Sequence, residues 1–281
     1  MQIDHRCSQF RFGEGIFLRI LRRSAALVSL YLVTVPLGHA ETALQAGEEL
    51  TYSVRWAILP GAGQIRIAAK ETLAGNSPRL SITTDTETRG LAKALMTFRA
   101  HSESIFDPDS GRIVALHESS IARSKRVDYS VRFDYDHRRA LFTGQGEAPI
   151  RSLELPEGDP ADLITTLMKT RRWDIEVGES QDVLVSYRDE FYELTVHAVR
   201  IERAKTPLGE FETLVLEPRM EKTPPKGMFK RGASVGIWVS RDDARLPVRF
   251  QVQFKFGTGV ATLVKYEPPD PVTDTRIAAY E

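Results

Sequence analysis

Apolar and polar residues alternate with a period of two over most of the chain. The clearest segments are 50–56, 127–136 and 248–256. Successive side chains of a β-strand point to opposite faces, so this pattern predicts strands with one buried and one solvated face. Such strands are typical of antiparallel sheets, because parallel strands covered by helices have continuous apolar runs.

Other segments extend the pattern along the chain. Strands are also predicted at 64–67, 79–88, 98–107, 112–123, 140–145, 181–187, 191–201, 210–217, 234–240 and 259–266. Residues that favour turns separate them, as at Pro60–Gly63 and Asp107–Gly111. Roughly a dozen strands at this spacing predict a mainly β, single-domain fold, in which one curved antiparallel sheet forms a half-barrel or a sandwich.

Two short helices are expected between the strands. The first is predicted at 159–172, where Asp159 caps the amino end and Pro160 fits the first turn. The second is predicted at 90–96, with Leu91, Leu95 and Phe98 on one side. We expect one helix and a few loops to cover the concave face of the sheet.

The first 40 residues have the composition of a secretory signal peptide. Five arginines oppose two acidic residues, an apolar run follows at 25–35, and Gly38 and Ala40 suit a small-residue cleavage site. We predict cleavage after Ala40, one β domain over 41–267 and a C-terminal tail over 268–281. The apolar run is shorter than a membrane span, so the cleaved protein is expected to be periplasmic and not transmembrane.

Composition excludes several classes of function. The whole chain has 38 basic residues (Lys and Arg) and 38 acidic residues (Asp and Glu). Residues 41–281 have 33 basic and 36 acidic residues, so their net charge is −3. A nucleic-acid partner is not expected, because such proteins need a basic excess. The single cysteine, Cys7, would be lost with the signal peptide. The remaining chain then has no thiol for catalysis, redox chemistry or zinc binding.

Residues with catalytic potential do not form a recognisable site. His101, Ser102 and Glu103 are consecutive, but in a strand Ser102 points away from the other two. A nucleophile must lie within hydrogen-bond reach of its base. Helical zinc spacing is absent from the histidines, and Asp107–Gly111 lacks the full ligand set of a calcium loop. We therefore predict a protein without catalytic residues, metal or cofactor, and not an enzyme.

Aromatic residues on the predicted inward faces are candidates for lining a ligand site. They are Tyr52, Trp56, Tyr129, Phe133, Phe250 and Phe254. In a closed sheet these side chains would form the core, and in a half-barrel under a helix they would line a cavity for an apolar ligand. Both arrangements bury the same faces, so both stay open. The face that carries Trp238 is also undetermined.

A basic segment between two predicted strands is a second candidate for binding. It contains Lys222, Lys226, Lys230 and Arg231, with Met228 and Phe229 between them. Basic clusters attract anionic lipid surfaces when they are dense. Because this segment also contains prolines and a glycine, a solvated hairpin loop is the simpler interpretation.

Three segments carry a family resemblance. They are GEELTYSVRW at 47–56, followed by Gly61 and Gly63, then TPLGEFET at 206–213 and GIWVSRDDARLPV at 236–248. They are similar to blocks of the domain-of-unknown-function 3108 family of exported bacterial proteins. The resemblance covers about residues 47–267 and implies export and a single β-rich domain. It implies no activity and no catalytic residue.

Three interpretations of the function follow. The first is an exported cell-envelope protein that binds or shelters a lipid-like apolar ligand in the periplasm. The alternative is a solid-core module for protein–protein interaction in envelope maintenance, which contacts an envelope protein through an edge strand or the 222–231 loop. An enzyme of unknown type is the third.

Overall fold

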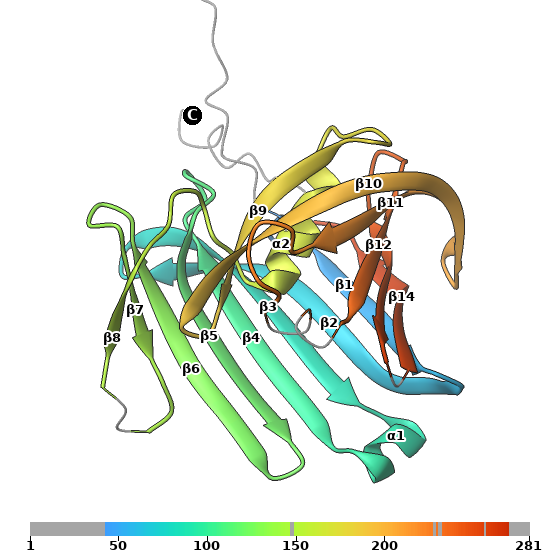
Figure 1. Ribbon diagram of the computed structural model, residues 1–281, viewed down its shortest axis with the longest axis horizontal. Coiled ribbons are helices and arrows are strands. Elements are labelled where there is room, and N and C mark those ends of the chain that lie inside the picture. The colour runs from blue at the N-terminus through green and yellow to red at the C-terminus, as the bar shows by residue number, and fades with distance from the viewer. Residues whose placement is uncertain (1–42, 147–148, 227–228, 230–231, 256, 270–281) are drawn as a thin grey trace, which may run out of the picture. The chain divides into compact units, whose positions relative to one another are not determined.

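The computed structural model describes residues 43–146, 149–226, 229, 232–255 and 257–269 (Figure 1). The predicted signal peptide and residues 270–281 of the predicted tail lie outside the described residues. The strands are β1 (Glu49–Trp56), β2 (Leu59–Ala74), β3 (Ser77–Thr88), β4 (Phe98–Phe106), β5 (Ile113–Ala122), β6 (Lys125–Asp134), β7 (Arg139–Thr143), β8 (Arg151–Glu154), β9 (Ser180–Tyr187), β10 (Glu190–Thr206), β11 (Gly209–Arg219), β12 (Ser234–Ser240), β13 (Pro247–Phe254) and β14 (Gly257–Glu267). The helices are α1 (Gly90–Leu95) and α2 (Leu163–Lys169), followed by the 3-10 turn η1 (Thr170–Arg172).

In the described part of the chain, these fourteen strands form one sheet. Their order is β8-β7-β6-β5-β4-β3-β2-β1-β14-β13-β12-β11-β10-β9. All neighbouring strands are antiparallel, including β1 and β14, which come from opposite ends of the sequence. The predicted mainly β fold with a curved antiparallel sheet and two short helices is confirmed. The sandwich alternative is wrong, because the ladder is continuous from β8 to β9 and forms one sheet rather than two.

Most predicted strands are present, with two differences. The strand β8 was not expected, because its four residues, Arg151–Glu154, are too few for an alternating pattern. The turn expected at Pro60–Gly63 is also wrong, because those residues belong to β2 and the chain turns at Ala57-Ile58. Ala57 has a φ of 50° and its N–H donates to the Thr258 carbonyl. A register shift between Val54 and Trp56 accommodates the extra residues of β2.

One face of the sheet carries α2, and we call it the inner face. Ser104 of β4 points to this face, where its hydroxyl donates to Asp162 Oδ2 at 2.6 Å. Met168 of α2 is fully buried in the core cluster that contains Phe106 and Ile113. Cross-strand register places Tyr52, Ile67 and the other inward positions on the same face. Figure 1 shows α2 enclosed by the curved sheet.

The helix α2 is shorter than the predicted 159–172 segment. Its N-cap is Asp162, whose side chain accepts from the Thr165 N–H at 3.0 Å, whereas Asp159 forms an ion pair with Arg112. The helix cannot begin earlier, because Ala161 is held extended by a parallel bridge to Val185 of β9. The predicted cap at Asp159 is therefore wrong.

The two edges of the sheet approach each other through side chains. Arg151 of β8 forms an ion pair of 2.5 Å with Asp189 in the β9–β10 turn. The Phe133 ring of β6 lies 6.4 Å from the Phe191 ring of β10. The backbone N–H of Arg188 in the same turn donates to the Tyr129 hydroxyl. The sheet therefore curls until the β9–β10 turn lies against the inner face of β6.

The helix α1 has no buried residue. The helix predicted at 90–96 is present, and Leu91 and Leu95, four residues apart in it, are 75% and 73% exposed. Phe98 belongs to β4 rather than to the helix. This six-residue helix lies in the β3–β4 connection, beyond the sheet, where no apolar surface of the described residues covers its leucines.

Connections alternate between two ends of the strands (Figure 1). The connection β3–β4 holds α1 and lies with β1–β2, β5–β6, β7–β8, β9–β10, β11–β12 and β13–β14 at what we call the α1 end. The others, including β8–β9 with α2, lie at the α2 end. The described residues of the α1-end connections include seven basic residues (Lys or Arg) and two acidic residues (Asp or Glu), which gives a net charge of +5. The described residues of the α2-end connections include seven basic and eleven acidic residues, which gives a net charge of −4.

Candidate functional site

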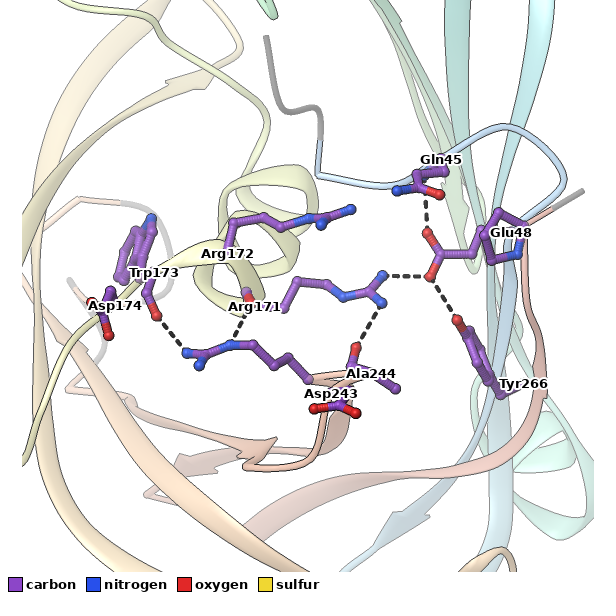
Figure 2. A pocket seen from close by; sticks show the side chains of 11 residues that line it. Gln45, Glu48, Arg171, Arg172, Trp173, Asp174, Asp243, Ala244 and Tyr266 are labelled. Carbon is purple, nitrogen blue, oxygen red and sulfur yellow. Dashed lines mark hydrogen bonds and ion pairs between the residues drawn. The ribbon is translucent and has the colours of Figure 1, made fainter. Parts of the chain in front are cut away.

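Four segments surround a cavity of about 470 Å³ at the α2 end (Figure 2). They are the turn before β1, the residues of η1 and just after it, the β12–β13 connection, and the end of β14. The volume is in the range of small-molecule sites. The walls, however, are mostly charged and polar, unlike the apolar walls that a lipid-like ligand requires.

A buried ion pair forms one wall of this cavity. Arg171 Nη1 lies 2.6 Å from Glu48 Oε1, and the two side chains are 6% and 2% exposed. Glu48 Oε1 also accepts from the Tyr266 hydroxyl at 3.1 Å, and its Oε2 accepts from the Gln45 N–H at 2.9 Å. Burial, followed by the nearby Glu48 carboxylate, raises the pKa of Tyr266. The phenol therefore stays protonated and continues to donate to Glu48.

Backbone carbonyls also accept hydrogen bonds from the guanidinium groups of Arg171 and Arg245. Arg171 Nη2 donates to the Ala244 carbonyl at 2.9 Å, and Arg245 Nε donates to the Arg171 carbonyl at 2.7 Å. Arg245 Nη2 donates to the Trp173 carbonyl. Figure 2 shows these contacts joining segments that are far apart in the sequence. The geometry makes this network a structural clamp, since its donors and acceptors are directed at each other rather than into the cavity.

The predicted aromatic residues lie on the inner face in two groups. In the first group, Tyr52 is fully buried and its ring lies 5.2 Å from that of Phe250, while its hydroxyl donates to the Pro247 carbonyl. Trp56 and Phe254 are half-buried and their rings are 5.9 Å apart. These rings meet across β14, where Gly257, Gly259 and Ala261 occupy the intervening inner positions.

The second group lies on β6, under the β9–β10 turn. Tyr129 is buried and its hydroxyl donates to Glu118 Oε2 at 2.6 Å. Burial and the same carboxylate raise the pKa of Tyr129. Phe133 is half-buried and contacts Phe191. The structure thus does not gather the six residues into one cluster, and their role in lining a ligand site stays a prediction.

Burial changes along the inner face of the central strands. Toward the α2 end, Ile82, Ser104 and Leu116 are buried against one another and α2. Toward the α1 end, inner positions on the same strands are half-buried. This half-buried region comprises Val54, Trp56, Ile65, Thr86, Ala100, Ser102, Glu118, Ser120, Val252 and Phe254. The helix fills only one end of the curved sheet.

The polar motifs of the sequence lie on the outer face or in turns. His101 Nδ1 pairs with Asp85 Oδ1 at 2.7 Å, and Glu103 accepts from the Ser81 hydroxyl, while Ser102 points to the inner face. Asp107 accepts from the Asp109 and Ser110 N–H groups as a turn residue. Among the described residues, no group of three or more His, Cys, Asp and Glu is placed to hold a metal ion.

Comparison with known protein families shows to which family the chain is related. A family model described as "Protein of unknown function (DUF3108)" matches residues 51–264. The chain belongs to the DUF3108 family. The resemblance seen in the sequence is thereby confirmed. The family description names no activity, and no curated protein matches the chain.

A solved structure shares the fold of this DUF3108 protein. It is a β-barrel-like protein of domain of unknown function DUF1849 from Brucella abortus, with a TM-score of 0.53 and 9% sequence identity. The match covers 82% of this chain and 100% of the other. At this identity the likeness shows the fold alone.

Two of the three segments that resemble the DUF3108 family meet at the clamp. The first contributes Glu48, and the last contributes Ala244 and Arg245. The sequence does not reveal this cluster, because Arg171 falls near the end of the predicted 159–172 helix, where a basic residue suits the helix dipole without any other partner. The only signal was the concentration of charged residues in both family blocks, which does not reveal their partner.

The alternative binding surfaces are largely engaged within the protein. Lys222 pairs with Asp182 and Lys226 with Glu190, and Phe229 is only 8% exposed. Residues 227, 228, 230 and 231 of the predicted basic loop lie outside the described residues. The edge strand β8 is short, and Ala161 covers part of β9. Trp238 points to the outer face opposite Arg249, where its Nε1 donates to Glu202.

Proposed function

We propose that this DUF3108 protein binds an apolar or amphipathic ligand at the half-buried region of the inner face. The observation that carries the proposal is the change in burial along single strands. On the central strands, residues that point to the inner face are buried near the α2 end and only half-buried near the α1 end. Inner positions of a completely filled barrel would be buried at both ends.

The residues in this region suit a ligand with both apolar and polar parts. Trp56 and Phe254 on one side offer aromatic surface for a hydrocarbon chain. On the other side, Thr86, Ser102 and Ser120 present hydroxyl groups that donate and accept hydrogen bonds. A lipid-like molecule with a polar ester or carboxylate group combines these two needs.

The place of action proposed for this ligand is the periplasm. Support comes from the composition of residues 1–40, which has the basic, apolar and small-residue parts of a signal peptide. None of the described helices has the length and apolar character needed to cross a membrane. Cell fractionation with an antibody to the folded domain tests this: the protein should be released with the periplasmic contents, and retention in the cytosol contradicts export.

A matched pair of substitutions tests the ligand site. Ser119 and Ser120 are neighbours on β5 with similar exposure, but they point to the outer and inner faces. Ser120→Trp places an indole in the proposed site, and Ser119→Trp places the same group outside it. Native mass spectrometry with oleate should show a complex with the wild type and Ser119→Trp. We expect Ser120→Trp to weaken it roughly tenfold or more, because about 0.8 kcal/mol is lost with each excluded methylene.

Two results would overturn the proposal. One is the absence of an oleate complex with the correctly folded wild type, both as isolated and after addition of oleate. The other is equal oleate affinity in the Ser119→Trp and Ser120→Trp variants, with both shown to be folded by circular dichroism. In the second case the ligand would bind elsewhere.

A further inference from the structure

The α1 end of the sheet has a rim of exposed apolar side chains. Ile58 in the β1–β2 turn is 91% exposed, and Leu91 and Leu95 of α1 are 75% and 73% exposed. The two segments are adjacent, because the Arg89 N–H donates to the Ala62 carbonyl and Gly90 lies against the Gly61 carbonyl. They belong to the turn between β1 and β2 and to the short helix α1, both of which lie at the ends of strands (Figure 1).

Basic side chains surround these apolar residues. Lys93 lies in α1, Arg99 follows at the start of β4, and Arg123 and Lys125 form the adjacent β5–β6 hairpin. The Arg123 N–H donates to the Thr97 carbonyl, so this hairpin lies directly beside the end of α1. All four side chains are exposed, and none forms an ion pair with a described residue. Their charge is therefore available to an external anion.

The combination differs from the rest of the described surface. Exposed apolar residues also occur at the α2 end, as at Leu73 and Leu208, but the connections there have a net charge of −4. Lysines of the β11–β12 loop are already paired with carboxylates. Around α1, two leucines and Ile58 that are each more than 70% exposed lie beside cations that form no ion pair with the described residues.

We propose that the α1 rim, consisting of Ile58, Leu91, Lys93, Leu95, Arg99, Arg123 and Lys125, docks on an anionic lipid bilayer. The leucines and Ile58 would enter the boundary between head groups and acyl chains, while the cations contact lipid phosphates. This is the distribution of apolar and basic residues that interfacial membrane-binding helices use. The positive charge of this end complements an anionic bilayer, and the negative charge of the opposite end directs the other surface away from it.

The proposal does not depend on ligand binding, although the two sites are adjacent. The rim lies at the same end of the strands as the half-buried region of the inner face. A protein docked in this orientation would present that region to the bilayer. The docking test uses vesicles and outer residues, so its failure is distinguishable from failure of the oleate experiment.

Site-specific fluorescence gives a test that uses the full chain. Leu91→Trp introduces an indole at the rim, and Leu73→Trp introduces one at the opposite end, where the native leucine is 69% exposed. Vesicles of phosphatidylglycerol and phosphatidylethanolamine with brominated acyl chains should quench the added fluorescence of Leu91→Trp and leave that of Leu73→Trp unchanged. Because both variants retain residues 1–40, membrane contact by that segment affects them equally.

Charge and apolar contributions are separated by two further variants. Lys93→Gln/Lys125→Gln should weaken binding to these vesicles roughly tenfold or more, since each basic group near an anionic surface contributes about 1 kcal/mol. Leu91→Ser/Leu95→Ser should weaken it similarly. The control Arg203→Gln/Lys205→Gln removes two exposed cations at the α2 end and should bind as the wild type does.

Several outcomes contradict docking by this rim. They are equal quenching of the two introduced indoles, no quenching at position 91, and equal losses in the rim variants and the α2-end control. Binding to neutral phosphatidylcholine vesicles as strong as to anionic ones would also exclude the electrostatic part of the proposal. Circular dichroism of each variant confirms that the fold is retained.

Discussion

The two ends of the sheet use the same kinds of residues in opposite ways. At the α2 end, Arg171 and Glu48 are buried and paired, and Met168 fills the space inside the sheet. At the α1 end, Lys93 and Leu91 are exposed, and the inner face of the central strands is half-buried, although inner residues of β9, β10 and β12 pack with Phe229 in a separate core. Because the same strands run through both ends, the backbone does not cause the difference. The side chains therefore pack tightly at the α2 end, and at the α1 end they leave apolar and basic groups exposed to solvent.

Breaking the buried ion pair should have the largest effect. Glu48→Gln leaves the Arg171 guanidinium buried without its counter-charge, and such a loss costs about 3–5 kcal/mol of unfolding free energy. The adjacent exposed pair of Glu49 and Arg66 is the control. Glu49→Gln should cost about 0–1 kcal/mol. Urea denaturation of both variants measures the difference, and equal costs would refute the description of the α2 end as a clamp.

Shortening apolar side chains should reveal the same asymmetry in packing. Met168→Ala creates a cavity under the helix and should cost about 2–5 kcal/mol. Phe254→Ala, at the half-buried end, should cost less, about 1–2 kcal/mol, because the ring is only half-buried. Thermal and urea unfolding of both variants test this. A larger loss for Phe254→Ala would mean that the α1 end is as tightly filled as the α2 end.

The sequence accounts for the sheet far better than for the clamp. Alternation along 127–136 depends on local residue spacing, so the strand β6 and its inward Tyr129 follow directly from it. The contact between Glu48 and Arg171 joins residues 123 positions apart. No local pattern encodes such a contact, because it exists only after the sheet has curled and α2 has entered it.

Errors at the helices have a related origin. Asp159 and Asp162 are both good caps by sequence, and the choice between them is made by the bridge from Ala161 to β9. Leu91 and Leu95 have helical spacing, but spacing does not reveal whether a surface lies opposite them. In both cases the outcome depends on contacts with residues distant in the sequence, and a single sequence does not reveal which residues those are.

A smaller effect is expected from the lysine at the end of α2. Burial lowers the pKa of Lys169, and Asp159 and Asp162 only partly oppose this. Below the lowered pKa the folded state therefore holds a charge that burial disfavours. Lys169→Met should raise the unfolding free energy at neutral pH by about 1 kcal/mol. The gain should shrink as the pH rises through the lowered pKa toward the unfolded value, because the wild-type penalty disappears there. A gain independent of pH would assign the effect to packing alone.

The smallest effect on stability is expected at the rim. Leu91→Ser/Leu95→Ser removes no buried contact, so the free energy of unfolding should change by about 0.5 kcal/mol or less. Urea denaturation in the absence of lipid measures this. A loss above about 2 kcal/mol would show that α1 supports the fold.

The pairing of β1 with β14 has a consequence for how the protein reaches its native state. Glu49 lies opposite Glu267, so the backbone hydrogen bonds between β1 and β14 form only when both ends of the domain come together. Contacts between such distant positions slow folding, because the entropy of closing a long loop is lost before these contacts stabilise the chain. A nascent chain that lacks residues 257–267 cannot complete the sheet, so this domain reaches its native state only after its last strand has been synthesised.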